Sequence, residues 1–201
     1  MKNAKFFPVA ATAIAAAIAL AGCGASGGSS PSGTSMSGMD HGGSSSSPAA
    51  TDHNAADVTF ARMMIPHHTQ AVKMSEMILK KQGIPAEVTA LAIRIKEAQG
   101  PEIEKVTAWL TGWKETTQMP AGHSMNGMMG AADMTKLEAA QGVEAAKLLL
   151  AQMVAHHQGA VTMAKTETTD GKNSEAVQLS TEIVNAQEAE IKEMQTMLAR
   201  L

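Results

Sequence analysis

The feature that most constrains the fold of this chain is an internal repeat that begins near residue 57 and runs to the C-terminus. The segment starting at Phe60 aligns with the segment starting at Leu149, and both carry the pattern Met-x-x-His-His. After a short gap, a second pair of matching segments starts at Leu91 and Leu179. Two copies of one supersecondary unit explain this self-similarity most simply.

Within each copy, the apolar positions recur at steps of three and four residues. This spacing places them on one face of an α-helix, whereas a half-buried strand would show strict alternation. The series in the first copy is Phe60, Met64, His67, Ala71, Met74 and Ile78. The sequence predicts four helices, over roughly 58–81, 86–115, 133–168 and 174–200, with Asp57 as the N-cap of the first.

A single amphipathic helical hairpin cannot bury its own apolar face. We therefore expect the two copies to close into an all-α, antiparallel four-helix bundle over residues 57–201, with repeats at 57–115 and 133–201. The composition supports an all-α domain, because aromatic residues make up only 2% of the chain while helix-forming residues are abundant. An all-β fold is thereby disfavoured.

The N-terminal sequence predicts a targeting signal followed by a flexible tether. Residues 1–22 combine two early lysines with an apolar stretch, as in a secretory signal peptide, and they end just before Cys23 in a sequence typical of a bacterial lipobox. The sequence predicts cleavage before Cys23 and lipidation of its sulfur; an ordinary signal with a leftover thiol is the alternative. Residues 23–56 are rich in Gly and Ser and are expected to form a disordered linker.

Nucleic acid is an improbable partner for this chain. The formal net charge is -3, so there is no basic footprint, and the scarcity of aromatic residues removes the stacking platforms that bases need. The expected partners are a metal ion, the membrane through the lipid anchor, and a protein that donates or accepts the metal. The sequence leaves the oligomeric state open.

The duplicated histidine pattern is the strongest candidate for a functional site. Each copy brings a thioether and two imidazoles to one side of a helix, and the candidate ligands are Met64, His67, His68, Met74, Met153, His156, His157 and Met163. A buried histidine can also be an ordinary core residue that has found a hydrogen-bond partner. Four polar residues of the partner helices are expected to support the ligands, or to be surface or structural residues: Gln99, Glu102, Gln187 and Glu190.

Methionine also gathers outside the predicted helices, in a glycine-containing loop over residues 116–132 and in the N-terminal tail. Thioethers are soft ligands that select Cu(I), and unlike thiols they form no disulfides in an oxidising compartment. Silver(I) is equally soft and is expected to bind as well. The accessory ligands that this pattern predicts are Met36, Met39, His41, Met119, His123, Met125, Met128 and Met129.

These motifs resemble the domain-of-unknown-function 305 family. Its hallmark is Met-x-x-His-His followed by a small residue and Met, with a downstream Ala-Gln-x-x-Glu-Ile helix, and both elements occur here twice, from Met64 to Ile103 and from Met153 to Ile191. The resemblance implies a ferritin-like four-helix bundle, secreted or lipid-anchored, that is associated with copper. Pro66 and Pro101 depart from the second copy and are expected to bend their helices.

Three function classes follow. The first is an extracytoplasmic, membrane-anchored copper protein, not an enzyme, that sequesters or transfers Cu(I) in metal homeostasis. The second is an iron-type di-metal redox enzyme, although the chain lacks the Glu-x-x-His motifs of that class. The third is a module without metal that senses pH or binds a partner through its paired histidines.

Overall fold

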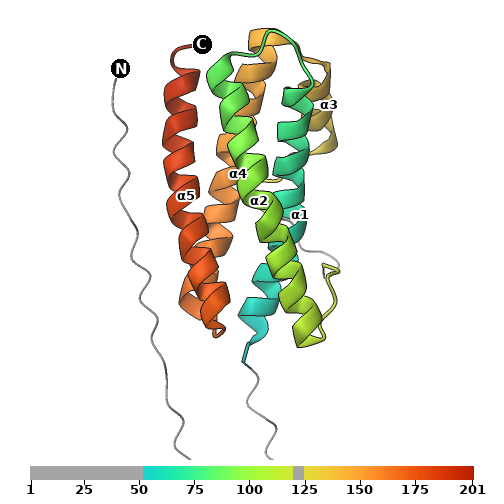
Figure 1. The fold of residues 1–201 in the computed structure, drawn as a ribbon, viewed down its shortest axis with the longest axis vertical. Helices are drawn as coiled ribbons and strands as arrows, with labels where there is room; N and C mark the ends of the chain where they lie inside the picture. Colours follow the sequence, from blue (N-terminus) through green and yellow to red (C-terminus); the bar gives the residue numbers. More distant parts are fainter. Residues whose placement is uncertain (1–51, 120–124) are drawn as a thin grey trace, which may run out of the picture. The chain divides into compact units, whose positions relative to one another are not determined.

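The computed structural model describes residues 52–119 and 125–201. Within these residues the chain is all-helical, without β-strands, and forms a helical bundle (Figure 1). The predicted signal peptide and five candidate residues lie outside the described part: Cys23, Met36, Met39, His41 and His123. The helices are α1 (Ala55–Leu79), α2 (Ala86–Trp113), α3 (Ala131–Ala139), α4 (Gly142–Asp170) and α5 (Ser174–Leu198).

The first helix begins earlier than the sequence pattern predicts. Its N-cap is Asn54, whose side chain accepts hydrogen bonds from the backbone N–H groups of Ala56 and Asp57, so the prediction of Asp57 as the cap is wrong. Asp57 instead completes a capping box by accepting from the Asn54 backbone N–H. A capping box satisfies two otherwise unpaired backbone donors, which explains why the helix extends into the expected linker.

The third predicted helix is two helices. The chain leaves the helical conformation at Ala140, which is extended, and re-enters it at Gly142 with a φ of +54°. A residue with positive φ interrupts a right-handed helix, and glycine adopts that conformation without strain. The short helix α3 also takes up the last two residues of the expected loop. Pro66 and Pro101, in contrast, lie inside α1 and α2 without ending them.

The helices form two hairpins that meet through α1 and α4. In Figure 1, α1 packs beside α2 and α4 beside α5, while α3 lies against the outer side near α1 and α4. A surface ion pair also joins α2 to α5: a guanidinium nitrogen of Arg94 lies 2.6 Å from a carboxylate oxygen of Glu193. None of the helices in the described ranges is long and apolar enough to cross a membrane.

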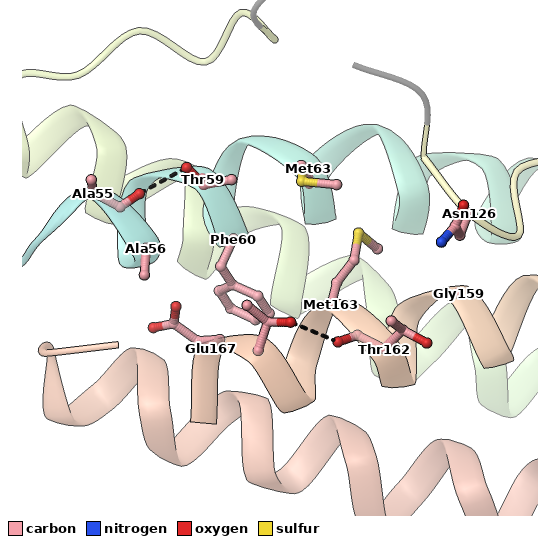
Figure 2. A pocket seen from close by; sticks show the side chains of 11 residues that line it. Ala55, Ala56, Thr59, Phe60, Met63, Asn126, Gly159, Thr162, Met163 and Glu167 are labelled. Atoms are coloured by element: carbon pink, nitrogen blue, oxygen red, sulfur yellow. Dashed lines mark hydrogen bonds between the residues drawn. The ribbon is translucent and has the colours of Figure 1, made fainter. Parts of the chain in front are cut away.

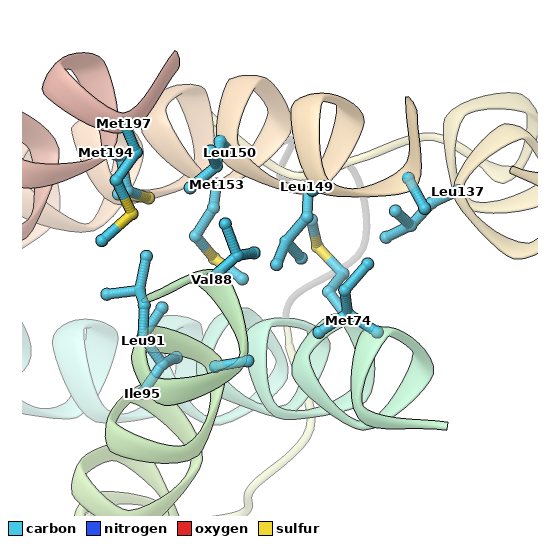
Figure 3. Close-up of a cluster of buried hydrophobic side chains, with 14 of the residues drawn as sticks. Met74, Val88, Leu91, Ile95, Leu137, Leu149, Leu150, Met153, Met194 and Met197 are labelled. Atoms are coloured by element: carbon cyan, nitrogen blue, oxygen red, sulfur yellow. The ribbon is translucent and has the colours of Figure 1, made fainter. Parts of the chain in front are cut away.

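The buried apolar side chains form two separate clusters along the bundle. The first, called the Met153 cluster, receives side chains from all five helices (Figure 3) and includes Met74, Leu91, Ile95, Leu137, Leu149, Met153 and Met194. The second, called the Met64 cluster, includes Val58, Phe60, Met64, Val106, Leu110, Leu179 and Ile183. Burial of these side chains contributes most of the free energy of folding.

Candidate metal centre

The four predicted histidines lie together in the core, between the two apolar clusters. His67, His68 and His157 have no exposed surface, and His156 is 1% exposed. His67 and His68 belong to α1 and the other two to α4, so each hairpin contributes one pair. The bundle therefore carries four buried imidazoles near the middle of its helices, and we call this group the histidine layer.

The predicted methionine ligands flank the histidine layer on both sides. Met74 and Met153 belong to one apolar cluster, while Met64 belongs to the other, and all three are fully buried. Met163 is partly buried and packs against the Met64 cluster. Each side of the layer therefore has two thioethers, one from each hairpin. These methionines fill core volume, and their sulfurs also provide soft donor atoms within the same core.

The two hairpins meet at His67 and His156. Their ring centroids are 3.8 Å apart and the ring planes are inclined by 38°. None of the four nitrogens of these two rings has a hydrogen-bond partner among the described residues. A buried polar atom without a partner costs free energy, so this pair lacks something that would satisfy it.

The protonation of this central pair follows from its surroundings. Burial, followed by the neighbouring imidazoles of His68 and His157, lowers the pKa of His67 to about 3, and the backbone of Asn126 partly offsets this shift. Burial and the same imidazole cluster lower the pKa of His156 to about 2. Both rings are therefore neutral at physiological pH, and each has a nitrogen lone pair that can bind a cation.

The outer two histidines are held by carboxylates from the partner helix of each hairpin. His68 Nε2 lies 2.8 Å from Glu102 Oε2, and His157 Nε2 lies 2.7 Å from Glu190 Oε2. When Nε2 donates to the carboxylate, Nδ1 carries the lone pair, and in both rings Nδ1 is buried without a partner. A carboxylate that fixes the tautomer and orientation of an imidazole is the usual support of a metal-binding histidine.

The two predicted glutamines also reach the core. Gln99 of α2 is 3% exposed and Gln187 of α5 is 4% exposed, and the side-chain oxygen of each is buried without a hydrogen-bond partner. Both glutamines sit one turn before the glutamate that contacts a histidine. They add two oxygen acceptors to the polar groups that the core leaves unsatisfied.

The described part of the methionine loop is fastened to the bundle by a residue that the sequence pattern does not single out. The Gln70 side chain donates to the Met129 carbonyl at 2.9 Å and accepts from the Met129 N–H at 2.7 Å. The side-chain amide of Gln70 thus makes the same pair of hydrogen bonds to Met129 that a neighbouring β-strand would make. Its only sequence signal is a polar residue three positions beyond His67.

A close glycine contact fixes the same loop on α4. A Cβ atom at Gly159 would lie 2.0 Å from the Asn126 carbonyl oxygen, so only glycine permits this approach. Gly127, with a φ of +83°, packs against the backbone of Ala155 and His156. The loop therefore lies directly over the turn of α4 that carries the central histidine. The sequence signal that could have indicated this contact is a glycine inside a helical pattern.

The remaining loop methionines occupy varied positions. Met119, Met125 and Met128 are partly buried. Met129 packs against the Met153 cluster, as does Met134 at the start of α3. Packing therefore accounts for part of the methionine content of this region, for which the sequence predicts a metal-binding role.

The donor atoms of the site are imidazole nitrogens and thioether sulfurs. Within the described residues, no three His, Cys, Asp or Glu side chains converge closely enough to hold a metal ion, and this includes the four histidines. Nitrogen and thioether donors suit Cu(I) and similar soft cations. Fold and site together define a helical bundle with a soft-donor core.

The chain belongs to the DUF305 family, a domain of unknown function, which it matches over residues 57–198. A DUF305 protein from Streptomyces coelicolor that is thought to be secreted is 33% identical, with a TM-score of 0.68 over 72% of this chain and 93% of its own. A DUF305 fragment from Deinococcus radiodurans is 29% identical, with a TM-score of 0.67 over 74% and 98% of the two chains.

The protein CopM has a similar structure. In its Cu(I)-bound form it is 33% identical, with a TM-score of 0.61 over 72% of this chain and 96% of its own. CopM has also been solved with Cu(II) and with silver. No curated protein matched this chain.

Proposed function

We propose that this protein binds Cu(I), and Ag(I) in its place, outside the cytoplasm, and sequesters or transfers the ion rather than catalysing a reaction. The observation that carries the proposal is the pair His67 and His156, whose buried ring nitrogens have no hydrogen-bond partner. A monovalent soft cation would satisfy these nitrogens with little charge to bury. The principal ligands are the eight Met and His residues of the two copies.

The surrounding chemistry supports copper over harder metals. Four thioethers flank the histidine layer, and thioethers bind Cu(I) in preference to Zn, Mg or Ca. CopM, a structurally similar protein, has been solved with copper and with silver bound, and this supports the choice of metal. The loop methionines and the tail cluster would act as accessory sites that capture the ion before it reaches the core.

The location and the finer fold belong to the same proposal. The lipobox at Cys23 supports a lipid-anchored protein on a bacterial membrane, with residues 23–56 as its tether. The four long helices are assigned to the antiparallel arrangement of ferritin-like proteins, with α3 as an addition to it. A donor or acceptor protein for copper would complete the pathway. Cys23→Ser should release the protein from the membrane fraction, and continued membrane association would contradict the anchor.

Anaerobic Cu(I) titration against a competing chelator tests the core site. The double variant His67→Leu with His156→Leu should lose the most tightly bound ion, while circular dichroism should show the same helix content. Leucine fills similar volume without unsatisfied nitrogens, so the metal-free variant should be at least as stable as the parent. If the double variant does not fold, His156→Leu alone provides the same comparison.

His53→Gln is the matched control, because His53 stacks on Trp113 outside the histidine layer. This control should keep full affinity. Unchanged Cu(I) affinity in the double variant would reject the core site. Metal-dependent oxygen consumption would support a redox enzyme instead, and a structural change between pH 7 and 5 without metal would support a pH-sensing module.

A further inference from the structure

A cavity of about 480 Å³ lies between α1 and α4, next to the Met64 cluster, with which it shares Phe60 and Met163. Its walls are mostly apolar and include Phe60 and Gly159. Two methionines also line it, Met63 from α1 and Met163 from α4. Figure 2 shows Met163 extending from α4 toward α1, with Met63 on the facing side of the same cavity. Two thioethers from different hairpins therefore share one solvent-connected space.

Met63 is not explained by the apolar pattern of its helix. The fully buried position of this turn is the adjacent Met64, whereas Met63 is only partly buried. Met163 is also partly buried. Met163 packs against the Met64 cluster, but Met63 belongs to neither apolar cluster, so core packing does not explain a thioether at position 63.

The cavity is connected to the central histidines through the loop. Asn126 lines it, and the next residue, Gly127, packs against the backbone of His156. The turn at Asn126 and Gly127 therefore touches both the cavity and the turn of α4 that carries His156.

We propose that Met63 and Met163 form a second soft-metal site, in the cavity between α1 and α4, from which Cu(I) or Ag(I) passes to His67 and His156. This inference rests on the proposed function, and it adds one ligand, Met63, that lies outside the set proposed above. Thioethers bind without losing a proton and exchange soft cations readily, which suits a site that first captures the ion. Met163, which packs against the Met64 cluster and also lines the cavity, is shared between the two proposed sites.

Silver titration of the full chain with 13C-labelled methionine methyl groups tests the proposal. The methyl resonances of Met63 and Met163, assigned through the variants Met63→Leu and Met163→Leu, should shift before the histidine ring signals do. Those of Met194 and Met197, buried in the Met153 cluster, should shift least. In the double variant, one silver ion per chain should be lost and loading of the histidines should slow severalfold.

Met197→Leu is the matched control and should keep both stoichiometry and loading rate. Methyl resonances of Met63 and Met163 that stay unchanged while the histidine signals shift would overturn the cavity site and leave the core site standing. Shifts at both methionines without any histidine response would instead support the cavity site and reject the core site. A double variant that loads the histidines at the parental rate would overturn the transfer step.

Discussion

The imidazole of His68 and the carboxylate of Glu102 join α1 to α2 within the core, with 2.8 Å between Nε2 and Oε2. His157 and Glu190 repeat this contact between α4 and α5 at 2.7 Å. Each hairpin thus contains its own histidine-carboxylate pair. The glutamates lie at the edge of the core, where their charge remains partly solvated.

Removal of these carboxylates should weaken metal binding without removing a ligand. We expect Glu102→Ala with Glu190→Ala to lower Cu(I) affinity by about 10- to 100-fold, because the imidazoles lose the group that orients them. Chelator competition measures the change. Glu104→Ala, an exposed position of α2, is the control and should have no effect. Equal affinities of the two variants would show that the glutamates serve the fold alone.

The metal-free bundle should lose stability in acid through its central histidines. The pKa of His67 is lowered to about 3 and that of His156 to about 2, so the unfolded chain binds protons that the native state does not. The free energy of unfolding is therefore independent of these two groups above about pH 6.5 and decreases as pH falls below it, by up to about 1.4 kcal/mol per pH unit for each histidine. Urea unfolding at pH 7, 6 and 5 measures this.

The leucine double variant provides the comparison for these urea unfolding measurements. His67→Leu with His156→Leu should flatten the acid dependence, because leucine does not titrate. In the folded parent, Cu(I) affinity of this pair should change little between pH 7 and 5, since no proton competes for the neutral rings. A steep loss of affinity in this range would mean that other groups bind the metal.

Glu167 should give the opposite pH dependence. Burial raises its pKa to about 8, and the neighbouring Asp57 contributes in the same direction. The native state therefore holds a proton that the unfolded chain releases, so stability is complete below about pH 4.5 and decreases as pH rises through 8. We expect Glu167→Gln to remove this decrease and to stabilise the protein at pH 8.5 in thermal unfolding. A parallel pH profile in the variant would contradict the assignment.

Asp57 explains why this proton matters for the fold. Burial raises the pKa of Asp57, but hydrogen bonds from Glu167 and from three backbone N–H groups outweigh burial and lower it overall. Two of these groups, at Lys172 and Asn173, are 3.0 and 2.9 Å from Asp57 Oδ1. The start of α1 is thereby tied to the turn between α4 and α5. Ionisation of Glu167 would place two carboxylates against each other at this junction.

Gly159→Ala should displace the loop while leaving the helices intact. Alanine favours a helix more than glycine does, yet its Cβ would collide with the Asn126 carbonyl. We expect unchanged helix content, faster amide exchange at Met129 and faster release of Cu(I). Gly100→Ala is the control, since nothing lies within 4 Å of its added Cβ. Identical exchange at Met129 in both variants would show that the contact does not hold the loop.

The sequence predicted most of the regular structure, because the repeat and its apolar spacing are local signals. It placed α1, α2 and α5 to within a few residues, and it identified the four histidines that the core brings together. It missed the break before Gly142, where one backbone conformation outweighs a continuous helical pattern. It also missed Gln70 and Met63, whose positions have meaning only once the loop and the second hairpin lie beside α1.

Gene duplication ordinarily creates a spare copy that is free to diverge. Here the two copies meet at equivalent residues, with His67 of one facing His156 of the other. A substitution in either half therefore alters an environment that both halves share. The repeat provides no redundancy at this position, and tolerance to mutation should be lowest where the two copies are most alike.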